Sequence, residues 1–333
     1  MIPKRPVASA LCALVAACAL FPASAMAWAD HDLLTREILR EVSWLNQYRA
    51  IKVTPYTYAA QEKGINPDYK PVYLDKLVGE TTNAREVMIR YADEPDWGLD
   101  DGLSASPAQA LAGGSRGYRH RSYHLANGVV KLGEGPARSR AYYDLARVAF
   151  NKKDTYWGFR FLARSVHYLE DMGQPYHTKP ILWRQLLDAK LDAKRLSTLS
   201  TNLNAYYEAY VSHHLRKQAA KGRGKWIGAI QDAKPADVFD AEAAAVALAD
   251  FSNARAPELL DALDRFWPKR VKSTKAVQPI RVSDLEPAEP PPSFGTIDEI
   301  TTLDLHVTSK MVRGLMALAK RDLLAPRPEE DLD

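Results

Sequence analysis

The chain has 333 residues, of which 46% are hydrophobic and 26% are charged, and its formal net charge is +4. This composition is ordinary for a soluble globular protein, and the length suits one large domain or two small ones. Two of the positive charges belong to Lys4 and Arg5, which leaves residues 28–333 with +2. Such a weak net charge does not argue for nucleic acid or an anionic membrane as a partner.

Residues 1–27 have the pattern of a signal peptide. A basic start is followed by an apolar stretch over residues 8–21 and by a small-residue cleavage motif that ends at Ala27. The apolar stretch is too short to span a membrane, so we expect an exported protein, periplasmic or secreted, without a transmembrane segment. Lipoprotein processing at Cys18 is the alternative. Cleavage after Ala27 would instead give Trp28 a free amino group.

Both cysteines, Cys12 and Cys18, lie in this first segment. The rest of the chain therefore has no disulfide, and its stability must come from core packing, with bound metal as a possible addition.

Helical periodicity dominates the rest of the chain, and alternating β patterns are absent. The first helix shows the pattern, with Leu34, Ile38, Val42 and Leu45 on one stripe. We predict an all-α fold with a single multi-helix domain. The expected helices cover residues 31–49, 74–91, 136–150, 154–173, 203–215, 236–267 and 297–324.

Two stretches lack a helical period. Residues 93–123 are rich in glycine and aromatic residues, and residues 272–295 are rich in proline. We therefore divide the chain into a helical domain, a Pro-rich linker, a C-terminal helix that packs back on the domain, and an acidic tail. These parts cover residues 28–271, 272–295, 296–324 and 325–333.

Three side chains of the types that bind metal ions fall within eleven residues. His167 and Asp171 are four apart on a predicted helix, so they share a face, which suits two ligands of one ion but also a simple hydrogen bond. His177 follows a helix stop at Gly173 and can turn back toward the same helix end. Imidazole together with carboxylate favours zinc over calcium or magnesium, and the absence of cysteine favours an open, catalytic type of site.

The segment His-Tyr-Leu-x-Asp-x-x-Gln-Pro-x-His, residues 167–177, resembles the core motif of the bacterial zinc-dependent phospholipases C and the related fungal single-strand nucleases. Those enzymes also begin their mature chain with a tryptophan, the position that Trp28 would take. The resemblance extends over residues 28–267 and implies an all-α domain with a cleft that holds three zinc ions.

The resemblance also implies a ligand set. One ion would be held by Trp28, His31 and Asp171, the last bridging to a second ion, and a third ion would be held by His177 and Glu208. The second ion would be completed by Asp93, His120 and His167. Asp93 competes with Asp96, Asp100 and Asp101, His120 competes with His124, and His31 could instead be an exposed residue of a first helical turn.

One position departs from the family pattern. Asn204 stands where the family has a histidine, one helical turn before Glu208. An amide oxygen is a poor zinc ligand, so Asn204 is a doubtful member of the third site, and two or three zinc ions per chain are expected. The alternative is that Asn204 hydrogen bonds to Glu208 and fixes its orientation.

The implied activity is hydrolysis of a phosphodiester, in which Asp93 would orient or deprotonate the attacking water. We expect a phospholipase C, with a headgroup pocket for a quaternary ammonium, an enzyme that could also contact membranes peripherally. The candidate residues of that pocket are Glu94, Trp97, Tyr118 and Tyr123. Alternatives are a single-strand nuclease that stacks bases on the same aromatic residues, and a catalytically impaired relative, as Asn204 could indicate.

Overall fold

Helices α7 (Gly135–Asn151) and α8 (Thr155–Asp171) form an antiparallel pair at the centre of the molecule. They belong to a computed structural model that describes residues 30–66, 68–100, 114–125, 130–179, 190, 192–266, 272–286 and 291–324. The predicted signal peptide, Trp28, Asp101 and the acidic tail lie outside the described residues. Pro136 occupies the first turn of α7, where its missing N–H costs nothing. Asp154 caps α8 by accepting from the Trp157 N–H.

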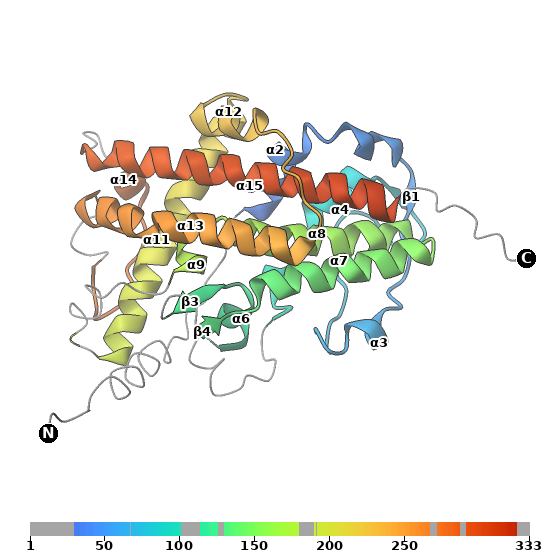
Figure 1. Ribbon diagram of the computed structural model, residues 1–333, viewed down its shortest axis with the longest axis horizontal. Helices are drawn as coiled ribbons and strands as arrows, with labels where there is room; N and C mark the ends of the chain where they lie inside the picture. Colours follow the sequence, from blue (N-terminus) through green and yellow to red (C-terminus); the bar gives the residue numbers. More distant parts are fainter. Residues whose placement is uncertain are drawn as a thin grey trace, which may run out of the picture.

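Every residue of α8 from Tyr156 to Asp171 is buried. Helices α2 (His31–Leu39), α4 (Ala84–Tyr91), α7, α13 (Ala241–Phe266) and α15 (Ser293–Leu323) all contact it. Figure 1 shows α13 and α15 running alongside each other, while α11 (Ala193–Ala220) crosses the bundle steeply. Polar groups on α8 are therefore enclosed by helices rather than exposed to water.

The remaining elements are short. They are the helices η1 (Ser43–Gln47), α3 (Ala59–Glu62), η2 (Glu94–Trp97), α6 (Gly114–Arg119), α9 (Pro175–Thr178), α12 (Lys225–Gln231) and α14 (Val282–Leu285), and the strands β1 (Ile51–Lys52), β2 (Thr81–Thr82), β3 (Tyr123–Leu125) and β4 (Val130–Leu132). β1 pairs with β2 and β3 with β4, both antiparallel. The all-α fold class is confirmed, with these two small sheets as additions that the sequence pattern did not show.

Two predicted helices are shorter in the structure. The helix expected over residues 31–49 ends at Leu39, because Arg313 and Arg85 donate to the carbonyls of Ile38 and Leu39 that a longer helix would use. The helix expected over residues 74–91 begins only at Ala84. Its first half is irregular, with Gly79 in the left-handed region at φ 95° and with β2 after it.

The other boundaries move outward or inward by a few residues. α11 is much longer than the predicted 203–215 because Asp192 caps it by accepting from the Arg195 N–H. α13 begins at Ala241, and α15 begins before the predicted residue 297.

In the Pro-rich stretch, the Asn202 side chain donates to the carbonyls of Ser273 and Ala276, so this stretch is tied to α11. None of the helices in the described ranges is apolar over enough length to cross a membrane.

Candidate metal centre

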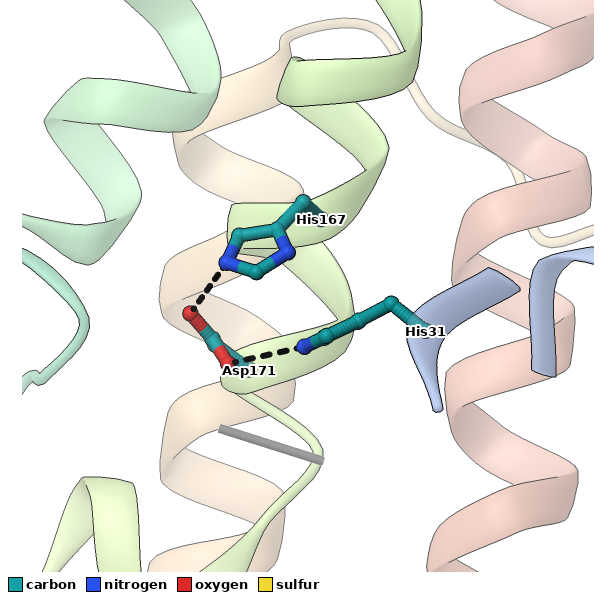
Figure 2. A group of neighbouring side chains, drawn as sticks. All are labelled: His31, His167 and Asp171. Carbon is teal, nitrogen blue, oxygen red and sulfur yellow. Dashed lines mark ion pairs between the residues drawn. The ribbon is translucent and has the colours of Figure 1, made fainter. Parts of the chain in front are cut away.

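Asp171, at the end of α8, is the centre of a buried cluster. His167 lies one turn earlier, and its Nε2 is 3.5 Å from Asp171 Oδ2. His31, the first residue of α2, places its Nε2 at 3.5 Å from Asp171 Oδ1. Figure 2 shows both imidazoles directed at the two oxygens of this one carboxylate. All three side chains are fully buried, so the reading of His31 as an exposed first-turn residue is wrong.

Two further histidines join from other segments. His120 follows α6, and its Nδ1 is 2.8 Å from Asp171 Oδ2 and 3.1 Å from His167 Nε2. His177 lies in α9, a short helix that begins at Pro175 and is capped by Gln174. Its Nδ1 lies 3.5 Å from Asp171 Oδ1. The break after α8 thus turns the chain so that His177 returns to the helix end.

Hydrogen bonds fix three of these rings. The Nδ1 atoms of His167 and His177 donate to the carbonyls of Ala92 and His120, at 2.7 and 2.8 Å. The Nδ1 of His31 is 2.7 Å from Glu170 Oε2. An Nδ1–H that points outward leaves Nε2 as the lone-pair nitrogen, which is the usual arrangement of metal-binding histidines.

Among the residues that the structure describes, several buried polar atoms of this cluster have no hydrogen-bond partner, including His31 Nε2, His177 Nε2 and Asp171 Oδ1. Buried polar atoms are almost always hydrogen bonded, so atoms like these call for a ligand. Two groups of potential ligand atoms lie within 4.8 Å of one another, His31 with His167 and Asp171, and Asp96 with His120 and His167. These donor groups could hold a metal ion.

The protonation of the cluster follows from crowding. Burial alone would lower the pKa of His31 and His120, but Asp171 raises the first well above its usual value and the second to about 9. Burial holds the pKa of His167 well below its usual value and lowers that of His177 to about 4. Burial opposes ionisation of Asp171, yet the surrounding imidazoles hold its pKa well below the usual range. Without a metal, protons thus compensate the charge of this carboxylate.

Three acids flank the histidines in different ways. Asp93 Oδ1 accepts from the Asp32 N–H at 3.1 Å, at the start of α2, and burial raises the pKa of Asp93 to about 6. Asp96 Oδ1 lies 4.0 Å from His120 Nδ1. Asp100 pairs with Arg138 and lies 3.2 Å from His120 Nε2. Asp96 thus lies near His120 and His167, the two histidines with which the resemblance grouped Asp93, and Asp100 contacts the other ring nitrogen of His120.

The third proposed site contains Asn204 in a supporting position. Glu208 Oε1 lies 3.8 Å from His177 Nε2. Asn204 donates to Glu208 Oε1 at 2.7 Å and accepts from Gln174 Nε2 at 3.1 Å. These two hydrogen bonds are the ones that the orienting role requires. Burial raises the pKa of Glu208 well above the usual range.

The four candidate headgroup residues differ in their surroundings. Glu94 is enclosed by ion pairs with Arg160 and Arg164, so its negative charge is already compensated. Trp97 is 44% exposed, Tyr118 is half-buried, and Tyr123 is buried with its hydroxyl donating to the Tyr176 carbonyl. Trp97 and Glu94 line a small hollow of about 150 Å³. The side chain of His124 lies outside the described residues.

Sequence reasoning missed Glu170 as a member of the site and named Asp96 only as a competitor of Asp93. Glu170 accepts from the Thr35 hydroxyl at 2.8 Å as well as contacting His31. The signal for Glu170 was its position three residues after His167, within reach of the same side of the helix. The signal for Asp96 was its place in a turn together with Asp93, a turn whose shape the sequence did not reveal.

The chain was also compared with known proteins. It matches no model of a known protein family, and a search of curated proteins finds no match either.

Proposed function

We propose that this protein is a zinc-dependent phosphodiester hydrolase, with phospholipid as its substrate class. The observation that carries the proposal is the buried group of histidines around Asp171, whose inward atoms lack hydrogen-bond partners. A purely structural cluster would satisfy these atoms within the protein.

The carboxylates around the site favour the binding of a metal cation. Asp171, Glu170, Asp93 and Asp96 lie close to the histidines, so oxygen ligands accompany the ring nitrogens. One zinc ion would be held by His31 and Asp171, and a second ion by His120 and His167 with Asp96 or Asp93, since only Nε2 of His167 is free to bind an ion. Zinc in such a site acts as a Lewis acid toward phosphate oxygens and lowers the pKa of water.

The protein's own groups then have separate tasks. Glu170 and the Ala92 carbonyl orient His31 and His167, and the surrounding helices exclude bulk water. Asp93 is held at the start of α2 by the Asp32 N–H, beside the cluster. Its carboxylate is placed to accept a proton from the water that attacks phosphorus.

A single-strand nuclease is the second candidate. A hollow of about 840 Å³ is lined by Arg49, Lys52 and Lys153 and by no acidic side chain, which suits a phosphate backbone. This hollow lies at the Thr155 end of α8, however, roughly 24 Å along the helix from Asp171. We therefore prefer the phospholipid.

Metal analysis with activity assays tests the proposal. We expect at least two zinc ions per chain, hydrolysis of phosphatidylcholine, and little hydrolysis of single-stranded DNA. His167→Ala and Asp171→Asn should each lower the zinc content and abolish turnover, because each removes a ligand. A preparation with one zinc ion or none, and without turnover, would indicate an impaired relative that only binds.

We also propose that the protein is exported and begins at Trp28 after cleavage. The described chain begins two residues later, at Asp30, and His31 already contacts Asp171, so the new amino group would be within reach of the cluster. Intact mass of the exported protein tests this directly. A chain that begins with a lipidated Cys18 would remove Trp28 from the ligand set.

A further inference from the structure

Asp30 holds the start of α2 in an unusual way. Its φ of 85° lies in the left-handed region, where few residues other than glycine are found and where aspartate and asparagine are among the exceptions. Asp30 occupies the N-cap position directly before His31, but its side chain makes no capping hydrogen bond. The Asp32 N–H, which such a cap would satisfy, donates to Asp93 instead. The Asp30 carboxylate is therefore available for a contact outside α2.

The Asp30 carboxylate contacts α11. The Ser212 hydroxyl donates to Asp30 Oδ2, and the Arg216 guanidinium forms an ion pair with Asp30 Oδ1. Ser212 is buried and the side chain of Asp30 is only 10% exposed, so the carboxylate lies at the edge of the core. The bond to Asp30 raises the pKa of Arg216. These contacts, which we call the Asp30 clamp, join segments that are 182 and 186 residues apart in the chain.

The partners of Asp30 continue a row of polar side chains on α11. Four of them follow one another at intervals of four residues along one side of the helix, namely Asn204, Glu208, Ser212 and Arg216. Asn204 accepts from Gln174 in the turn after α8 at 3.1 Å. Glu208 Oε1 lies 3.8 Å from His177 Nε2. α11 therefore reaches the segment of His177 with one end of this row and the segment of His31 with the other.

The clamp acts on the backbone that carries His31. This histidine is the first residue of α2 and follows Asp30 directly, and its Nε2 lies 3.5 Å from Asp171 Oδ1 (Figure 2). Glu170 contacts the other nitrogen of the same ring. A rotation of the backbone at Asp30 would move α2 together with the imidazole. The contacts of the Asp30 carboxylate with α11 oppose that rotation, as bonds around a ligand keep it in place in metal sites.

We infer that Asp30 is a positioning residue of the metal centre. Through its anchor on α11 it sets the place of His31, and with it the affinity for the zinc ion that His31 and Asp171 would hold. The inference rests on the proposed function for the identity of the ion. The second ion, at His120 and His167, should not depend on the clamp, because none of its proposed ligands lies on α2 or α11.

The experiment is zinc titration of the exported protein in competition with a fluorescent chelator. Asp30→Gly is the most informative variant, because glycine adopts the left-handed conformation freely and only the carboxylate is lost. We expect it to weaken binding of the His31 ion about ten- to a hundredfold and to leave the other ion unchanged. Asp30→Asn should recover most of the loss, since asparagine also tolerates this conformation and keeps an oxygen for the Ser212 hydroxyl. His31→Ala identifies the titration step that belongs to this ion.

Two controls match these changes. Lys153 is another residue in the left-handed region, at φ 63°, and it lies just before the Thr155 end of α8, so Lys153→Gly should leave zinc binding unchanged. Lys217 is the neighbour of Arg216 on α11 but pairs with Glu286, so Lys217→Gln should also leave zinc binding unchanged. Arg216→Gln should weaken the His31 ion by a smaller factor than the loss of the whole carboxylate, because the hydroxyl bond of the clamp remains.

The two ions of one chain separate positioning from a general structural role. Equal zinc binding by Asp30→Gly and Lys153→Gly would overturn the inference, because the clamp would then only tether α2 to α11. Equal weakening of both ions in Asp30→Gly would overturn it as well, since the effect would not pass through His31. Two zinc ions bound without hydrolysis of phosphatidylcholine would overturn the proposed function and leave the clamp intact. No zinc binding by the native protein would overturn both.

Discussion

Two buried charged clusters lie along one face of α8, and they differ in how completely they are satisfied. Arg160 and Arg164 occupy the middle of the helix, and His167 and Asp171 continue the same stripe to its end. All four side chains are fully buried. Among the described residues, the first pair is enclosed by partners except at Arg164 Nη2, whereas the second leaves several inward atoms without hydrogen-bond partners.

The arginine cluster is closed by ion pairs, and Arg164 Nη2 is its one atom without a hydrogen-bond partner among the described residues. Glu94 accepts from Arg160 and Arg164, and Glu62 accepts from Arg164 at 2.7 Å. The remaining Glu62 oxygen accepts from the Tyr56 hydroxyl at 2.7 Å. Aromatic rings cover the guanidinium groups, with Arg160 3.7 Å from the centroid of the Tyr91 ring. Two positive and two negative charges therefore compensate one another.

The histidine cluster is open, which means that its polar atoms are not all satisfied within the protein. In the described part of the chain, several of its inward atoms have no hydrogen-bond partner, among them His31 Nε2, His177 Nε2 and Asp171 Oδ1. Burial of a charge is costly unless it is paired or binds a metal. The comparison teaches that two equally buried charged clusters on one helix can have different roles. The closed cluster stabilises the fold, and we infer that the open cluster binds a ligand.

The largest effect should come from breaking the closed cluster. Glu94→Gln leaves Arg160 and Arg164 with a single carboxylate, so we expect a loss of about 3–5 kcal/mol in the free energy of unfolding. Urea denaturation measures it. The control is Glu86→Gln, which breaks an exposed pair with Arg90 and should cost at most about 0.5 kcal/mol. Equal losses in the two variants would contradict the special role of the closed cluster.

Lowering the pH should gradually remove the contribution that the Glu94 carboxylate makes to the free energy of unfolding. Burial alone would raise the pKa of Glu94, but the charges of Arg164 and Arg160 lower it from 4.5 to about 2. A carboxyl whose pKa is lower in the folded chain stabilises the fold above the unfolded value, and this stability is lost as the pH falls from 4.5 through 2.

The amount that this pKa shift represents is roughly 3 kcal/mol. The stability difference between the native chain and Glu94→Gln should therefore shrink below pH 4.5, as followed by urea denaturation at successive pH values. A difference that stays constant down to pH 2 would show that the carboxylate of Glu94 is not the charged partner.

Chelation should act on the open cluster only. If zinc is present at about a hundred times its dissociation constant, removing it should cost about 2.7 kcal/mol of stability. In His167→Ala this zinc-dependent part should largely disappear, because a ligand is gone. His306→Ala is the matched control, since His306 bonds to the Ala229 carbonyl away from the cluster. A zinc response in His167→Ala equal to that in the control would refute the metal centre.

The sequence predicted the fold best where helices are long and periodic. α7 and α8 begin and end within a few residues of the expected positions, because Pro136 and Asp154 act locally. The end of α2 was missed because Arg313, 275 residues away from Ile38 in the chain, takes that carbonyl. A contact between such distant segments leaves no local pattern in the sequence.

The candidate site shows the same limit. His167, Asp171 and His177 could be grouped from their spacing, because the helix and the turn after it are local features. Glu94 was taken for a substrate residue because Arg160 and Arg164 could not be seen to approach it from α8. Two arginines on an otherwise apolar helix were the available signal, since buried arginine requires partners.

The smallest effect should come from Asn204, at the edge of the open cluster. It accepts from Gln174 and donates to Glu208, so its amide links the turn after α8 to α11. Asn204→Ala removes both hydrogen bonds and should cost about 1–2 kcal/mol of stability. It should also weaken zinc binding by His177 and Glu208 about ten- to a hundredfold, because Glu208 loses its orientation.

Asn204→His separates orientation from direct binding of metal. An imidazole at this position can still contact both Gln174 and Glu208, so on the orienting account the number of zinc ions per chain stays the same. If position 204 is instead a ligand position with the wrong side chain, the histidine adds a nitrogen ligand one turn from Glu208. Zinc content would then rise toward three per chain, and turnover would rise with it. The hydrogen bond to Glu208 favours the first result, and zinc titration of the native and histidine chains decides between them.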